Sequence, residues 1–121
     1  MKEVTYTGSC GCGAVCFSAM GQPIMVANCH CTDCRHATGA AFSTFVDFKT
    51  TQIRWSGTPR KTYRSSPGVR RGFCENCGTP LSYETGHEPN EICLFIGIFD
   101  APNFIPRQQE AELNKLSWVK L

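Results

Sequence analysis

The chain is organised around one short stretch, Cys29-His30-Cys31-Thr32-Asp33-Cys34-Arg35. A buried cysteine behaves as a small apolar side chain, and a hydrophobic core gives no reason to gather three of them in a polar, turn-like segment. Thiolates this close repel one another unless a cation lies between them. Soft sulfur ligands favour zinc among the common metals, so the stretch predicts a zinc site.

Two cysteine pairs flank this stretch, one in a Cys-Gly-Cys-Gly turn and one in a Cys-x-x-Cys-Gly turn. The spacing of a Cys-x-x-Cys pair lets both sulfurs face one ion. The glycine that follows allows a turn that directs backbone N–H groups at sulfur. A structural zinc needs four ligands, so each pair complements the other. We expect this zinc on Cys10, Cys12, Cys74 and Cys77. Because metal binding then supplies folding energy, replacing any of the four by serine should unfold the domain.

The central stretch leaves a triplet of thiols, Cys29, Cys31 and Cys34. Three protein ligands with an exchangeable fourth position are typical of a reactive zinc site. Alternatively, the triplet is a second structural site that is closed by His30, Cys16 or Cys93. Ligation by His30 would strain the backbone between two ligating neighbours, which favours a role in the fold. Cys16 and Cys93 lie in strand-like patterns and are expected to be core thiols. Three thiolates leave bound zinc formally negative, which favours an incoming thiolate over activated water.

Length and composition fit one soluble domain covering residues 1–121, with 41% hydrophobic and 18% charged residues. Nine cysteines are an odd number, and a disulfide framework would favour an even one. The formal net charge of +2 is too small to indicate nucleic acid. No apolar run is long enough for a membrane span, and the N-terminal residues lack a signal-peptide pattern. We therefore expect a cytoplasmic protein with reduced thiols.

Turn residues recur at short intervals, which predicts a mainly β fold. Residues 92–99 are apolar on both faces and are expected to form the central buried strand. Residues 108–116 have a helical composition, and residues 35–39 favour a helical turn. Further strands are expected at residues 4–7, 14–19, 24–27, 42–48, 53–55, 61–64, 69–73 and 81–83.

The order and spacing of seven cysteines carry a family resemblance. The sequence reads Gly-Ser-Cys-Gly-Cys-Gly over residues 8–13, Cys-His-Cys-x-x-Cys-Arg over residues 29–35, and Phe-Cys-x-x-Cys-Gly-Thr over residues 73–79. This pattern resembles the glutathione-dependent formaldehyde-activating enzyme family, also called the GFA or centromere protein V domain. The resemblance extends over roughly residues 4–99, and the chain is similar to the short members of the family.

The resemblance implies a fold, a metal content and a reaction. It implies an Mss4-like fold of several curled antiparallel sheets held by zinc, with two Zn²⁺ per chain. The four paired cysteines would hold a structural zinc, and the triplet would hold a second zinc at the active site. The implied activity is that of a carbon–sulfur lyase acting on glutathione, or a similar thiol, and its small carbonyl adduct. S-Hydroxymethylglutathione is the adduct in the enzyme that gives the family its name.

Charged residues near the triplet are candidates for holding such a thiol, because glutathione carries carboxylates. Arg35 is the nearest in sequence and is our candidate for substrate binding. Arg64, Arg70 and Arg71 are further candidates, although a solvated strand face is the preferred interpretation for Arg70 and Arg71. Asp33 or Thr32, within the central stretch, is a candidate proton carrier.

Three other functions stay open from the sequence. A thiol carrier would use the same zinc without turnover. A zinc-ribbon-like module would bind a macromolecular partner through basic residues between positions 60 and 71. A redox sensor would release the second zinc on oxidation.

Overall fold

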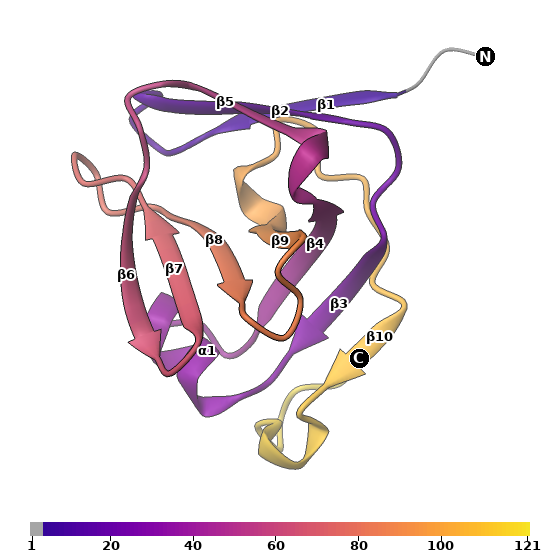
Figure 1. Cartoon of the computed structure of the whole chain (residues 1–121). Coiled ribbons are helices and arrows are strands. Elements are labelled where there is room, and N and C mark those ends of the chain that lie inside the picture. The colour runs from indigo at the N-terminus through magenta and orange to yellow at the C-terminus, as the bar shows by residue number, and fades with distance from the viewer. Residues whose placement is uncertain (1–3) are drawn as a thin grey trace.

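The computed structural model describes residues 4–121, which form mainly β-strands in two sheets (Figure 1). The strands are β1 Thr5–Ser9, β2 Val15–Met20, β3 Met25–Cys29, β4 Ser43–Lys49, β5 Ile53–Gly57, β6 Lys61–Ser66, β7 Val69–Phe73, β8 Pro80–Thr85, β9 Glu91–Phe95 and β10 Gln108–Glu110. The helical elements within these residues are α1 Thr32–Thr38 and short 3₁₀ turns at Thr50–Gln52, Ile96–Ile98 and Glu112–Asn114. The mainly β class expected from the sequence is confirmed. No helix of the described residues is both long and apolar enough to cross a membrane.

The two sheets differ in size and lie at an angle to each other. The small sheet has the order β1-β2-β5, and the large sheet has the order β10-β3-β4-β9-β8-β7-β6. In Figure 1 the small sheet lies across one end of the curled large sheet, and α1 lies by the lower ends of β6 and β7, where Cys34 contacts Arg71. All strand pairs are antiparallel except β10 and β3, which run parallel. The expectation of purely antiparallel sheets is therefore wrong at the β10 edge of the large sheet.

Aromatic side chains fill the space between the sheets. Phe99 contacts Phe17 and Phe104 with ring centroids 5.0 Å apart in each pair, and Tyr6 lies 4.8 Å from Phe104. Gly8 on β1 bridges to Phe99, and a side chain at this position would collide with the backbone oxygen of Ile98 and the ring of Phe17. Only glycine lets these backbones approach so closely.

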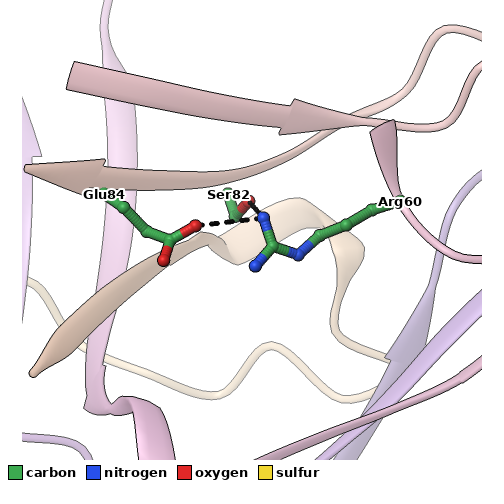
Figure 2. Close-up of polar contacts among 3 residues, drawn as sticks. All are labelled: Arg60, Ser82 and Glu84. Atoms are coloured by element: carbon green, nitrogen blue, oxygen red, sulfur yellow. Dashed lines mark hydrogen bonds and ion pairs between the residues drawn. The ribbon is translucent and has the colours of Figure 1, made fainter. Parts of the chain in front are cut away.

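Arg60 connects the small sheet to the large one. Its guanidinium lies 4.7 Å from the ring centroid of Trp55 on β5. Figure 2 shows the same guanidinium reaching Ser82 and Glu84 on β8, with Nη1 at 3.1 Å from Ser82 Oγ and 3.0 Å from Glu84 Oε1. Because Ser82 is fully buried, its hydroxyl depends on this donor.

The central strand is shorter than the sequence indicates. We expected residues 92–99 to form one strand buried on both faces, but β9 ends at Phe95 and a 3₁₀ turn follows at Ile96–Ile98. Gly97, which has a weak strand propensity, lies within that turn. The strand is central, and it buries Ile92 and Leu94 on one face while Cys93 on the other face lines a cavity.

The expectation of a helix at residues 108–116 is wrong. Gln108–Glu110 form β10, which pairs with β3 from Ala27 to Cys29. The chain then turns at Ala111, whose φ of 53° is left-handed, into the 3₁₀ turn at Glu112–Asn114. The free edge of β3 offers backbone hydrogen bonds that outweigh the local helix propensity.

Candidate metal centres and the adjoining cavity

The two cysteine pairs meet in space to form the first thiol group. Cys10 and Cys12 lie on the turn between β1 and β2, and Cys74 and Cys77 lie on the turn between β7 and β8. The sulfurs of Cys10 and Cys12 are 3.6 Å apart, and those of Cys12 and Cys74 are 3.8 Å apart. All four sulfurs lie within 4.8 Å of one another.

The surroundings of the first thiol group suit a bound cation. A tetrahedron with Zn–S bonds of about 2.3 Å has S–S edges of roughly 3.8 Å, close to the observed separations. Val15 N donates to Cys10 Sγ at 3.3 Å, and Asn76 Nδ2 donates to Cys12 Sγ at 3.3 Å. A hydrogen bond to the Thr79 hydroxyl lowers the pKa of Cys77 to about 5. These four thiols could therefore hold one metal ion.

The triplet forms the second thiol group, at the end of β3 and the start of α1. Cys29 Sγ and Cys34 Sγ are 3.5 Å apart, and Cys34 N donates to Cys31 Sγ at 3.2 Å across the helix N-terminus. The three sulfurs lie within 4.8 Å of one another, and Cys29 and Cys34 are buried. Gly39, with φ of 70°, ends the helix and keeps it short. The triplet could hold a second metal ion.

The alternative fourth ligands lie outside the triplet. His30 is fully buried, its Nε2 lies 2.8 Å from Gln109 Oε1 on β10, and its ring lies against Phe42. Cys16 Sγ donates to Gly13 O at 3.2 Å. Neither residue, nor Cys93, belongs to a ligand group found among the described residues. The expectation of a core thiol is wrong for Cys16, which is only partly buried and packs in no core cluster of residues 4–121. Cys93 is also partly buried, and it packs against the small core cluster of Cys29, Cys34 and Phe45.

A cavity of about 150 Å³ opens beside the triplet. Its floor includes one row of residues that are in register across the large sheet: Met25, Asp47, Cys93, Tyr83 and Arg71. Residues directly opposite one another on neighbouring strands share a face, which explains why five strands contribute to one surface. The triplet, Asp33 and Glu110 form other parts of the lining.

The two arginine candidates occupy different environments. Arg35 on α1 donates through Nη2 to Thr32 Oγ1 at 3.3 Å, and it is not part of the cavity lining. Arg71 on β7 is only 5% exposed, lines the cavity, and has Nη2 at 3.6 Å from Cys34 Sγ. The solvated strand face preferred for Arg71 is therefore wrong, whereas Arg70 is exposed. Successive residues of a strand point to opposite faces, so the adjacent positions of Arg70 and Arg71 indicated that the two side chains would lie in different environments.

Two pairs of groups in the cavity have perturbed pKa values. The hydrogen bond from Cys34 lowers the pKa of Cys29 to about 6, and the same contact together with burial raises the pKa of Cys34. Burial and the carboxylate of Glu91 raise the pKa of Asp47 to about 7. Burial and then the charge of Asp47 raise the pKa of Cys93, whose Sγ lies 3.7 Å from Asp47 Oδ1. Within the triplet, Cys29 therefore ionises more readily than Cys34, whereas Cys93 stays a thiol.

Two thiol groups of this geometry on a mainly β fold define a protein with two candidate metal centres, one of which adjoins a cavity. The family model of the glutathione-dependent formaldehyde-activating enzyme matches residues 5–115. The chain belongs to this family.

Comparison with individual proteins agrees with this assignment. The chain is 35% identical over 104 residues to an uncharacterized lyase of Schizosaccharomyces pombe, covering 79% of this chain and 75% of the relative. The crystal structure of a Rhodobacter sphaeroides protein matches with a TM-score of 0.67 at 19% identity, covering 85% of this chain and 98% of that one. At this identity the second match supports the fold alone.

Proposed function

We propose that the chain is a zinc-dependent carbon–sulfur lyase that acts on glutathione or a similar thiol and its small carbonyl adduct. The observation that carries the proposal is the cavity beside a three-thiol group, because it gives a small molecule access to a candidate metal centre. The family's glutathione-dependent activity and the lyase name of the yeast relative support the same reaction class.

The proposal assigns different roles to the two thiol groups. Cys10, Cys12, Cys74 and Cys77 would hold a structural zinc that joins the β1–β2 turn to the β7–β8 turn. Cys29, Cys31 and Cys34 would hold the second zinc. Zinc on three thiolates would supply a soft fourth position that favours the deprotonated form of an incoming thiol. All these ligands need reduced thiols, so we also propose a cytoplasmic location.

The reaction joins sulfur to carbon without an oxidant. The substrate thiol loses its proton, its sulfur bonds to the carbonyl carbon as the C=O π bond breaks, and the carbonyl oxygen takes up a proton. The reverse sequence is the lyase direction. Asp33 lines the cavity next to Cys34, and we propose that its carboxylate carries the proton between the sulfur and oxygen atoms.

Surface charge supports a small-molecule substrate over nucleic acid. Among the basic residues that favoured the nucleic-acid alternative, Arg60 pairs with Glu84 and Lys61 pairs with Glu75. Arg71 is buried. Few of these side chains are left to contact phosphates.

Calorimetric titration of glutathione into zinc-loaded, reduced protein tests the proposal. We expect binding to the wild type that is lost in Cys31→Ser and kept in Cys16→Ser, which changes a cysteine outside both thiol groups. Formaldehyde is then added, and adduct formation is followed by NMR against the uncatalysed rate. Binding without acceleration would identify a thiol carrier. No binding at millimolar glutathione would remove the glutathione-specific proposal.

A further inference from the structure

Arg71 has a buried guanidinium that is only partly used by the protein. Its Nε donates to Ser65 Oγ at 3.2 Å, its Nη2 lies 3.6 Å from Cys34 Sγ, and its Cζ lies 5.0 Å from the ring centroid of Tyr83. These contacts hold the guanidinium in one orientation. Its Nη1 is buried and has no hydrogen-bond partner among residues 4–121.

The charge of Arg71 also lacks a carboxylate partner. The ion pairs found among the described residues involve Arg60 and Lys61, and neither includes Arg71. A buried donor without an acceptor is costly. Cys34 Sγ, which would be a zinc-bound thiolate in the proposed enzyme, contacts the Nη2 side of the guanidinium, whereas the Nη1 side has no acceptor among the described residues.

Arg71 lines two cavities although only 5% of it is exposed. It lines the cavity beside the triplet, and it also lines a second cavity of about 350 Å³ bounded mainly by apolar groups. The second cavity includes Tyr63, Phe73 and Phe95. Because the first cavity is lined by both the triplet and Arg71, one small molecule in it could place its thiol at the triplet and its acid group beside Arg71.

The acidic residues of the cavity do not cancel the attraction of the Arg71 guanidinium for an anionic ligand. Asp33 and Glu110 are exposed, so water screens their charges. Asp47 has a pKa raised to about 7 by burial and by Glu91, so its charge is incomplete at neutral pH. Arg71 is only 5% exposed. Its charge therefore interacts with a nearby anion more strongly than a charge in water would.

We propose that Arg71 binds the carboxylate of the substrate thiol through Nη1, so that the site selects small thiols bearing an acid group a short carbon chain away from sulfur. The inference rests on the proposed function and narrows its substrate class. It assigns substrate recognition to Arg71 on β7, in addition to any contribution from Arg35 on α1.

A matched set of thiols tests this selection on the unaltered protein. Mercaptopropionate, mercaptopropionamide and cysteamine present an anion, a neutral amide and a cation at similar distances from sulfur. Titrated into zinc-loaded wild type, the acid should bind roughly ten- to a hundred-fold more tightly than the amide, since a hydrogen bond to a charged group is worth about 1.5–3 kcal/mol. Equal affinities, or tighter binding of cysteamine, would overturn the selection while leaving the proposed function intact. Failure of every thiol to bind would refute both.

Variants then assign the selection to one side chain. Arg71→Gln should lose the preference for acid over amide and keep amide binding, and Arg71→Lys should restore part of it. Arg70→Gln, which changes the exposed neighbour, should keep the full preference. A preference that persists in Arg71→Gln and disappears in Arg35→Gln would place the carboxylate on α1 and overturn the inference. Circular dichroism and zinc content of each variant confirm that the comparison is made on folded protein.

Discussion

Replacing Arg60 by methionine should destabilise the protein far more than its surface charge alone suggests. The Arg60–Glu84 pair has an N–O distance of 3.0 Å, and its side chains are only 18% and 25% exposed. The change also removes the donor to the buried Ser82 hydroxyl and the contact with Trp55. Methionine keeps much of the apolar stem, so the polar contacts are the main loss.

The size of this effect follows from the separate contacts. A hydrogen bond to a charged group is worth about 1.5–3 kcal/mol, and an unsatisfied buried hydroxyl costs about 1–3 kcal/mol. The cation–π contact adds about 0.5–1 kcal/mol. Since one nitrogen atom serves both Ser82 and Glu84, these terms overlap, and we expect a loss of about 2–3 kcal/mol in the free energy of unfolding.

Lys61→Met provides the matched control. The Lys61–Glu75 pair is 3.5 Å long with side chains 62% and 57% exposed, so its loss should cost less than about 0.5 kcal/mol. Urea unfolding of zinc-loaded, reduced protein, followed by circular dichroism, measures both variants. Similar midpoints for the two variants would refute the assignment of Arg60 as the connection between the sheets.

Three further predictions concern the metal, the cavity and the core. Cys77→Ser should lose one equivalent of zinc and most folded structure, whereas Cys16→Ser should keep both zinc ions and the fold; atomic absorption and circular dichroism decide between these results. Because the pKa of Asp47 is raised to about 7, the folded state binds its proton more tightly than the unfolded state does. The contribution of Asp47 to stability should therefore fall by about 1–2 kcal/mol, after allowing for solvent screening, between pH 4 and pH 7. The difference between wild type and Asp47→Asn in urea titrations at each pH measures this contribution, because the pH dependence of zinc binding is common to both proteins. Gly8→Ala should cost more than about 2 kcal/mol because its side chain meets backbone, whereas Gly86→Ala, with its nearest atom at 3.8 Å, should change stability by less than about 0.5 kcal/mol; thermal melts compare the two.

Local spacing made the thiol groups predictable from the sequence. Cys-x-x-Cys and Cys-x-Cys fix the separation of their own sulfurs, and the need for four ligands brings the two pairs together. The start of α1 was harder to predict from the sequence. Its N-cap is Cys31, whose thiol accepts a hydrogen bond from Cys34 N, whereas the usual N-cap residues are serine, threonine, aspartate and asparagine. The division into two centres followed from the same cysteine spacing, and the arrangement of the sulfurs now supports it.

Features that depend on strand register were not predictable in the same way. β10 exists because β3 offers an edge far away in sequence, and no pattern within residues 108–116 signals that partner. Arg71 on β7 contacts Cys34 on α1 although 37 positions separate them in the sequence, and closeness in the sequence favoured Arg35 instead. Cys93 looked like a core thiol because its neighbours Ile92 and Leu94 are buried, yet it faces the cavity.

The central claim is that the sulfur of the substrate approaches a metal ion held by Cys29, Cys31 and Cys34. Near-ultraviolet absorption of the cobalt-substituted protein tests it most directly, because thiolate ligation of cobalt gives an intense charge-transfer band there. Adding glutathione should strengthen this band, and adding S-methylglutathione, which lacks a free thiol, should leave it unchanged. A glutathione complex that forms with no change in the band would contradict the account.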